Sequence, residues 1–172
     1  MRYLIIIIFF ILSCSKPNKY SLTGNVNLND DDKVFLVQMK DNRPVLIDSS
    51  TVVSGEFKFS DSINFPEMHY LFFEKITGNI PFVLEPGNIK IDVYKDSLRS
   101  SKITGTKSNK DWTDYLSQTQ PYTSELNNIQ IEINQSLRLG DSVLIYDLEE
   151  QFIDMRSKLV DYEFLFMNNR KE

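Results

Sequence analysis

The sequence predicts an α+β protein in which an antiparallel β-sandwich is followed by a C-terminal α-helical hairpin. Three observations support this fold class. Between residues 20 and 106, apolar side chains alternate with polar ones, and turn-forming residues repeatedly interrupt the alternation. From residue 107 onward, apolar residues instead recur every three or four positions. Gly140 divides that second region into two stretches of helical length.

The first region divides into seven or eight short strands, a number and spacing typical of a sandwich. We expect strands over residues 20–28, 34–39, 45–53, 56–59, 68–76, 81–85, 89–94 and 102–105. Ser54-Gly55 is typical of a tight turn, so 45–53 and 56–59 are predicted to form a hairpin. Ile89, Ile91 and Val93 alternate with polar residues, which indicates a half-buried strand.

Two apolar stripes predict the helices. Ser108-Asn109-Lys110-Asp111 resembles a capping box at the start of the first helix. Pro121 lies inside that helix, so we expect a kink or two abutting helices there. The first stripe contains Trp112, Tyr115, Thr119, Tyr122, Leu126, Ile129 and Ile133. The second contains Ile145, Leu148, Phe152, Met155, Leu159, Tyr162 and Phe166.

The stripes allow two packing arrangements. In the first, they pack against each other and against one face of the sandwich. In the second, they offer a coiled-coil-like seam to a second copy or to a protein partner. Phe164 and Leu165 flank the second stripe, so the helices carry more apolar surface than a narrow seam requires. Such excess often marks an interface, and we therefore expect some association through the helical hairpin.

The N-terminus is typical of a bacterial lipoprotein signal peptide. Leu4–Leu12 is an apolar run behind the positive Arg2, and Ile11-Leu12-Ser13-Cys14 resembles a lipobox. At about 1.5 Å per residue, this run is too short to cross a bilayer as a helix. We predict lipidation of Cys14; the alternative is a plain secretory leader with an incidental cysteine. The expected organisation is leader 1–13, tether 14–19, sandwich 20–106 and helical hairpin or connector 107–172.

The net charge of the chain and the composition of the tether indicate which partners and which location to expect. The formal net charge is −5 and there is no basic stripe with interleaved aromatic residues, which disfavours nucleic acid as a partner. The tether Ser15–Lys19 lacks the acidic cluster that directs some envelope lipoproteins to the cell surface. We therefore expect a membrane contact through the lipid anchor, in the cell envelope, on the outer membrane and facing the periplasm.

No residue pattern predicts a catalytic, cofactor or metal site. His69, the only histidine, lies inside an apolar strand and is expected to be packed. Asp30-Asp31-Asp32 lacks the spacing of a calcium loop and is expected to be a solvated turn. Glu85 precedes Pro86-Gly87 and is expected to fix a hairpin turn, and Trp112 is expected to pack between helix and sheet.

A family resemblance rests on motifs that occur in a fixed order. They are Leu22-Thr23-Gly24, Lys33-Val34-Phe35-Leu36, Asp48-Ser49, Gly55-Glu56-Phe57-Lys58-Phe59, Pro66, Phe82-Val83-Leu84-Glu85-Pro86-Gly87 and Gly105-Thr106-Lys107-Ser108-Asn109. In these motifs the chain resembles the uncharacterised N-terminal domain of thioredoxin-like thiol–disulfide oxidoreductase lipoproteins, of the peroxiredoxin type found in Bacteroidota. In that family a connector leads to a thioredoxin-like domain with a Cys-x-x-Cys pair. Here no cysteine follows Cys14, so the family's redox activity cannot be assigned to any residue.

Two functions are therefore expected. The first is a non-catalytic, lipid-anchored binding or interaction module whose ligand the sequence does not identify. The second is the accessory N-terminal part of a thiol–disulfide oxidoreductase, either truncated or acting with a separate thioredoxin-like protein. Neither function requires this chain to be an enzyme.

Overall fold

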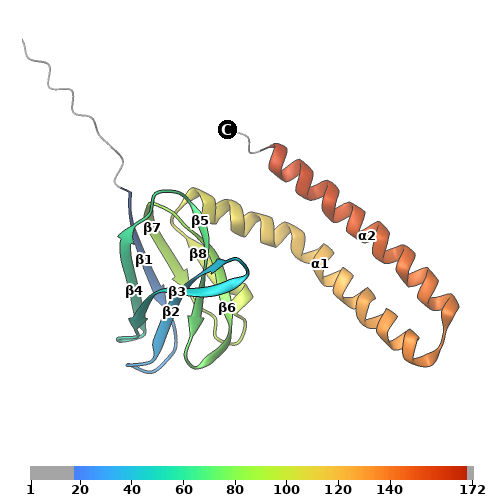
Figure 1. Ribbon diagram of the computed structural model, residues 1–172, viewed down its shortest axis with the longest axis horizontal. Coiled ribbons are helices and arrows are strands. Elements are labelled where there is room, and N and C mark those ends of the chain that lie inside the picture. Colours follow the sequence, from blue (N-terminus) through green and yellow to red (C-terminus); the bar gives the residue numbers. More distant parts are fainter. Residues whose placement is uncertain (1–17, 170–172) are drawn as a thin grey trace, which may run out of the picture.

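The computed structural model describes residues 18–169 and has the predicted α+β architecture (Figure 1). Two sheets of four strands each pack face to face, and two long helices follow them. The strands are β1 (Lys19–Asn25), β2 (Lys33–Lys40), β3 (Arg43–Thr51), β4 (Glu56–Ser62), β5 (Glu67–Phe73), β6 (Ile76–Leu84), β7 (Gly87–Asp92) and β8 (Lys102–Thr104). A 3-10 turn, η1 (Leu98–Ser100), precedes β8, and the helices are α1 (Lys107–Leu139) and α2 (Ser142–Asn168).

The strand order departs from an all-antiparallel sandwich at one pair. The first sheet has the order β4-β1-β7-β8 and the second has the order β3-β2-β5-β6. All neighbouring strands are antiparallel except β1 and β7, which are parallel. Parallel neighbours need a long connection between them. Here β2 to β6, including the whole second sheet, lie between β1 and β7 in the sequence, so the connection is long enough.

The core lies between the two sheets and contains eighteen buried apolar residues. It draws on both sheets, because the inward residues alternate with outward ones along each strand. Ile89 and Ile91 of β7 are fully buried, as the alternation predicts. The fully buried side chains from the second sheet are Val34, Leu36, Leu71, Ile80, Phe82 and Leu84.

A glycine makes one close contact in this core possible. Gly24 in β1 lies opposite Phe57 in β4. A Cβ atom at position 24 would lie 2.0 Å from the Phe57 ring, so any side chain there would overlap it. The ring of Phe57 is 1% exposed and makes edge contacts with Phe59 and Phe73. Gly24 thus allows a buried aromatic cluster to lie directly on the backbone.

The predicted hairpin between residues 45–53 and 56–59 is wrong. β3 pairs with β2 in one sheet and β4 pairs with β1 in the other, so the chain changes sheets at this point. Ser54 and Gly55 do make a tight turn with positive φ, but only one bridge, Val53 to Glu56, follows it. Val52, immediately before the turn, is fully buried between the sheets. The chain therefore passes between the two sheets at this residue, and β3 and β4 do not pair.

A two-residue hairpin does join β2 to β3. Its turn residues, Asp41 and Asn42, both have positive φ, at 49° and 57°. Two positive φ angles are typical of a type I′ turn, whose twist matches that of the flanking strands. Pro44 follows in β3, which lies at the edge of its sheet, where a missing N–H costs little.

Each helix is continuous. α1 runs through Pro121 without interruption, so the alternative of two abutting helices is wrong. Pro121 is exposed, and water can therefore serve the carbonyl group that loses its helical N–H partner. Gly140 ends α1 as predicted, with φ at 75° and its N–H donating to the Ser136 carbonyl. Asp141 then starts α2, because its carboxylate accepts from the Leu144 N–H at 3.1 Å.

The two helices form an antiparallel hairpin that extends away from the sandwich (Figure 1). Only the first turns of α1 pack on the strands, and the expectation that both stripes cover a sandwich face is wrong. The two stripes pack mainly against each other, as the first arrangement also predicted. Within residues 18–169, neither helix combines the length and the apolar character that a membrane-spanning helix needs.

Candidate interaction surface

The hairpin is attached to the sandwich where α1 covers the outer edge of β6. β6 is the last strand of its sheet, so one of its sides has no neighbouring strand. Asn109 takes that place: its Oδ1 accepts from the Val83 N–H at 2.9 Å and its Nδ2 donates to the Val83 carbonyl at 2.7 Å. Trp112 Nε1 donates to the Pro81 carbonyl at 3.2 Å, and the ring packs against the core as predicted. These bonds satisfy backbone groups that an open edge would expose.

A carboxylate from the β6–β7 turn caps the start of α1. Glu85 accepts from the Ser108 N–H at 2.9 Å and from the Ser108 hydroxyl at 2.8 Å. The predicted capping box at 108–111 is therefore wrong, since the helix already begins at Lys107 and its cap comes from another element. The expected role of Glu85 is also wrong, because its side chain binds the helix N-terminus, where negative charge is favoured.

The chain enters α1 close against β7. Gly105 has φ at +111°, and a Cβ atom there would lie 2.0 Å from the Asn88 carbonyl oxygen. The glycine therefore allows the chain to turn from β8 into the helix beside β7. Together with Glu85 and Asn109, it explains why the Gly105–Asn109 motif lies next to the Phe82–Gly87 motif in space.

The inner face of the hairpin is a small apolar seam. Ile129, Ile133 and Leu148 are its buried apolar residues, and Phe152 and Met155 pack partly buried beside them. Toward the sandwich the seam continues as a series of aromatic rings. In it Trp112 stacks on Tyr115 at 5.5 Å between centroids, Tyr115 meets Phe166 edge-on at 5.3 Å, and Tyr122 stacks on Tyr162 at 6.3 Å.

One polar bond joins the two helices within this aromatic series. The Tyr115 hydroxyl donates to a carboxylate oxygen of Glu163 at 2.6 Å. This hydrogen bond, aided by burial and by the negative charge of Glu163, raises the pKa of Tyr115 to about 12. The phenol therefore stays protonated, and keeps donating, well above neutral pH.

The outer face of α2 carries a second apolar stripe whose large side chains are mostly exposed. It follows heptad spacing, alternating steps of three and four residues, from Val143 to Met167. The stripe, which we call the outer seam, consists of Val143, Tyr146, Glu150, Ile153, Ser157, Val160, Phe164 and Met167. Its six large apolar members are between 53% and 72% exposed. A helix with apolar stripes on opposite faces has more apolar surface than a two-helix hairpin can cover.

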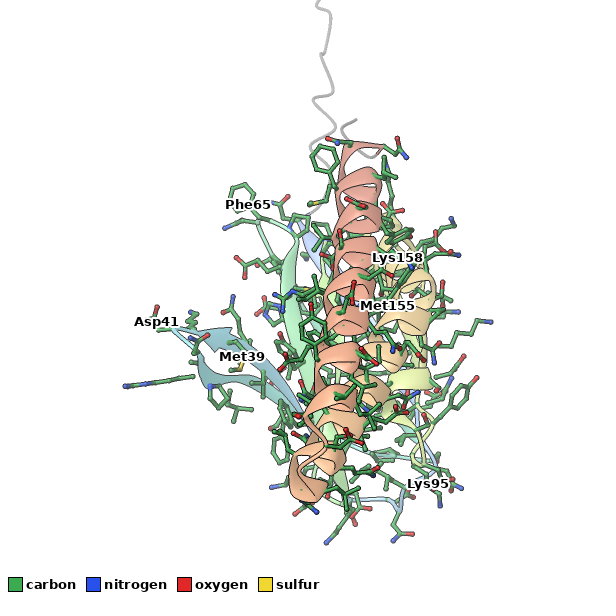
Figure 2. All side chains as sticks on the ribbon, turned by 90° about the vertical axis from the view of Figure 1, so that its right-hand side faces the viewer. Met39, Asp41, Phe65, Lys95, Met155 and Lys158 are labelled. Carbon is green, nitrogen blue, oxygen red and sulfur yellow. The ribbon has the colours of Figure 1, made fainter. Side chains whose placement is uncertain are left out.

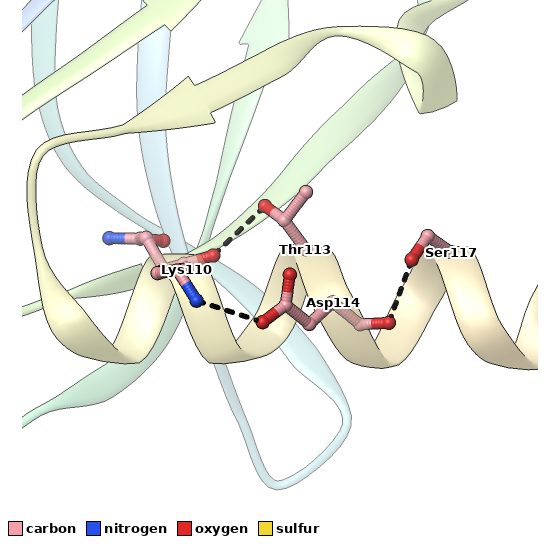
Figure 3. A network of polar contacts seen from close by, with 5 residues as sticks. Lys110, Thr113, Asp114 and Ser117 are labelled. Carbon is pink, nitrogen blue, oxygen red and sulfur yellow. Dashed lines mark hydrogen bonds and ion pairs between the residues drawn. The ribbon is translucent and has the colours of Figure 1, made fainter.

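The outer face of α1 shows that this stripe is specific to α2. At the corresponding heptad positions, facing away from α2, α1 has Thr113, Ser117, Gln120, Ser124, Asn127, Ile131, Asn134 and Arg138. All eight are exposed, and only Ile131 is apolar. Local polar contacts continue on this side of the first turns, where Lys110 pairs with Asp114 at 3.3 Å and the Ser117 hydroxyl donates to the Asp114 carbonyl at 2.9 Å (Figure 3). α1 thus has an ordinary solvated outer face.

The outer seam is bordered mainly by acidic residues. Asp147, Asp154 and Asp161 follow one edge at intervals of seven, and Glu149 and Arg156 lie on the other edge. Asp154 pairs with Lys158 at 2.6 Å, an exposed ion pair. α2 holds six acidic and two basic residues, which gives a net charge of −4 in a chain whose net charge is −5.

A second exposed apolar group lies on the β2–β3 hairpin. The pairing of β2 with β5 ends at Val37, so the remainder of this hairpin is a two-stranded arm. Figure 2 shows the arm, with Met39 and Asp41, projecting away from the sheets and from the helices. Met39 and Val45 are exposed on it, and Leu46 and Ile47 are exposed at its base.

The structure places the remaining predicted residues apart from one another. Cys14, the predicted lipidation site, lies outside the described residues. His69 is 3% exposed, its Nδ1 lies 3.3 Å from the Glu67 carbonyl and burial lowers its pKa, so it is packed as predicted. In the aspartate turn, Asp30 and Asp31 are exposed, but Asp32 is buried and accepts from the Asn29 N–H at 3.3 Å. That turn is therefore only partly solvated.

Two hollows of the described surface lie at the loop end of the sandwich. One, of about 440 Å³, is lined by Asn25, Val26, Asn27, Ser54, Gly55, Glu56, Asp92, Val93 and Tyr94. Another, of about 490 Å³, is lined by Asn27, Leu28, Asn29, Asp32, Lys75, Ile76 and Lys95. Neither is lined by a residue of α1 or α2. Within residues 18–169, no three His, Cys, Asp or Glu side chains are grouped to hold a metal ion.

Sequence reasoning found the exposed Phe164 and Leu165 but missed the outer seam as a whole. The signal was available, since Tyr146, Ile153, Val160 and Met167 repeat every seven residues. The inner stripe alone accounts for a helix that packs on one side, so its regular spacing gives no indication of a second stripe.

The fold and this surface define the class of the protein: a β-sandwich that carries a projecting helical hairpin with an apolar outer face. Residues 20–112 match the model of a family described as a domain of unknown function, DUF4369. This match covers more than half of the chain, which therefore belongs to the DUF4369 family. It includes the sandwich and the α1 residues Asn109 and Trp112 that bind β6, and it ends before the outer seam begins. A comparison with curated proteins found no match.

Proposed function

We propose that this chain is a lipid-anchored lipoprotein of the cell envelope that acts as a non-catalytic binding module, with the outer seam of α2 as its contact surface. The outer seam is the observation that carries the proposal. Six large apolar side chains lie exposed along one helix face, while the matching face of α1 is polar except for Ile131. A protein rarely keeps such a stripe in water unless a partner covers it.

The anchor is proposed from the sequence. Leu4–Leu12 and the lipobox-like segment before Cys14 support export and acylation at Cys14. Two or more acyl chains hold a protein on a membrane effectively permanently, whereas one chain does so only marginally. The short tether would then keep the sandwich near the membrane, on the periplasmic side of the outer membrane.

Metabolic labelling tests the anchor. In cells grown with labelled palmitate, the protein should carry the label and fractionate with outer membranes, and the Cys14→Ser variant should do neither. An unlabelled wild-type protein would remove the anchor from the proposal.

Site-directed photo-crosslinking tests the binding role. A photoreactive amino acid at Tyr146 in the outer seam should give a specific crosslinked product in intact envelopes. The same amino acid at Ser124, exposed on the outer face of α1, is the matched control and should give none. The absence of a product from Tyr146, or equal products from both positions, would contradict the proposed function.

The alternative proposal is an accessory role in a thiol–disulfide oxidoreductase system. The ordered motifs from Leu22 to Asn109 favour it, because they resemble the domain that precedes the thioredoxin-like domain of envelope oxidoreductases. The thiol pair would then lie on a continuing or a separate thioredoxin-like polypeptide. Sequencing the genomic DNA that follows codon 172 tests this alternative: a thioredoxin-like frame there, or in the adjacent gene, would support it. Disulfide-reductase turnover by the isolated chain would contradict both proposals.

A further inference from the structure

We infer that the outer seam of α2 binds an amphipathic helix of a partner protein, whose own apolar stripe is bordered by lysine and arginine. This inference rests on the proposed function and names the chemistry of the partner. Three properties of the outer seam support this partner. Its members follow heptad spacing, its borders are mainly acidic, and those acidic residues would repel a second copy of α2 or an anionic membrane.

The spacing of the outer seam fits another helix. Steps of three and four residues keep its members on one side of α2, as in the seam of a coiled coil. The seam from Val143 to Met167 is roughly 36 Å long at 1.5 Å per residue, which gives a helix of several turns a continuous contact. Helix-in-groove recognition uses this pattern of apolar anchors.

The charges around the seam select a basic partner. Asp147, Asp154 and Asp161 form one border, and Glu150 lies within the seam itself. A lysine or arginine of the partner opposite Glu150 would pair with its carboxylate and fix the register of the two helices. With a net charge of −4 on α2, basic borders on the partner would also speed the encounter.

The same charges disfavour a second copy of this chain. In an antiparallel pair, each row of three aspartates would face the same row of the other copy. In a parallel pair, Glu149 would face Asp154 of the second copy, and Glu150 would face its own copy within the seam. The one attractive pair, Arg156 with Asp161, would not offset these like charges. Like charges at such positions destabilise helix pairing. An anionic membrane surface is disfavoured in the same way, since interfacial helices on anionic lipids carry basic polar faces.

Two synthetic helical peptides with identical leucine–isoleucine stripes test the inference, one bordered by lysine and one by glutamate. Each is titrated against the mature anchored chain in nanodiscs of zwitterionic lipid, and binding is followed by fluorescence anisotropy. The lysine-bordered peptide should bind at least about tenfold more tightly than the glutamate-bordered one. Asp147→Asn combined with Asp161→Asn should reduce that preference by roughly fivefold, as expected for exposed charges.

Paired serine substitutions locate the contact. Ile153→Ser combined with Val160→Ser should lower the affinity for the lysine-bordered peptide roughly 100-fold, because two apolar side chains are no longer buried against the peptide. Ile131→Ser, on the polar outer face of α1, is the matched control and should leave binding unchanged. Both variants should keep the wild-type circular dichroism spectrum, which excludes misfolding as the cause.

Several results would overturn the inference. These are equal affinity for the two peptides, no binding of either, competition by vesicles of anionic lipid, and dimerisation of the chain that depends on Ile153. If Tyr146 crosslinks a protein in envelopes but the peptides show no preference for lysine, the proposed function stands and only this inference fails. If no crosslink forms, the proposed function fails and the inference fails with it.

Discussion

The sandwich and the helical hairpin bury their apolar residues to very different degrees. The sandwich encloses eighteen buried apolar residues between two sheets, and polar residues occupy most of its outward positions. The hairpin encloses three buried apolar residues, while its second helix exposes six large ones along the outer seam. The sandwich therefore encloses a core of its own, whereas α2 has a continuous apolar stripe that no described part of the chain covers.

This difference separates residues that hold the fold from residues available for binding. In the sandwich, an apolar side chain such as Phe82 contributes its burial to folding. On the outer face of α2, Phe164 or Ile153 contributes little to folding, because each stays in water. Substitutions in the two regions should therefore change different measurements, and the following predictions test that separation.

The largest effect is expected for Phe82→Ala in the sandwich core. Phe82 is fully buried, so its removal should lower the free energy of unfolding by about 3–5 kcal/mol. Phe164→Ala removes the same atoms from the outer seam and should change it by less than about 0.5 kcal/mol. Urea denaturation of both variants makes the comparison. A large loss for Phe164→Ala would show that the outer seam is part of the folded core.

Gly24→Ala should have the next largest effect, up to about 3 kcal/mol, through overpacking. The new methyl group would lie 2.0 Å from the Phe57 ring, which cannot move without disturbing Phe59 and Phe73. Ser21→Ala, at an exposed position in the same strand, is the control and should be nearly neutral. Equal urea midpoints for the two variants would contradict the close contact.

Asn109→Ala tests the joint between the two regions and should cost about 2 kcal/mol. The substitution leaves the N–H and the carbonyl of Val83 without their side-chain partners. Hydrogen exchange of the Val83 amide should accelerate, because β6 then has an open edge. The control is Asn128→Ala, at an exposed position on α1. Unchanged exchange at Val83 would mean that another group covers that edge.

The smallest effect is a pH dependence confined to the hairpin. The pKa of Tyr115 is raised from 10.0 to about 12 by its bond to Glu163, so the folded hairpin favours the neutral phenol. The resulting stabilisation is fully present below about pH 10 and is lost as the pH rises toward 12. The stability difference between wild type and Tyr115→Phe, measured by urea denaturation, should shrink across that interval. A stability difference that stays constant with pH would show that ionisation of Tyr115 does not weaken its hydrogen bond to Glu163.

The parts of the fold that depend on local pattern could be predicted from the sequence. Alternation identified strands such as the one containing Ile89 and Ile91, and Gly140 marked the end of α1 correctly. Pairings between distant segments could not be predicted in this way. Glu85 and Ser108 are 23 residues apart, and no local pattern indicates that one caps the helix of the other. The parallel pairing of β1 with β7 could not be predicted for the same reason, because it depends on where the whole second sheet lies.

The candidate surface was predictable in part. Phe164 and Leu165 lie beside the inner stripe in the sequence, and this excess of apolar residues predicts an interface without knowledge of the fold. Which face of α2 remains open depends on which face packs on α1, and only the three-dimensional arrangement settles that choice. The acidic residues of α2 could be read from the sequence. That they border an exposed apolar stripe follows only from the position of the outer seam in the structure.

The central claim, that the outer seam is covered in the envelope but not in the isolated protein, is tested most directly by thiol labelling. Ser157→Cys places a reactive group within the outer seam, and Ser60→Cys places one on the exposed side of β4 as a control. The sulfur of Cys14, the only natural cysteine, is acylated in the proposed anchor, so the wild-type chain should give no labelling background. The account predicts that Ser157→Cys reacts several times more slowly in intact envelopes than after purification, while Ser60→Cys reacts equally fast in both. Equal rates for Ser157→Cys in the two settings would contradict it.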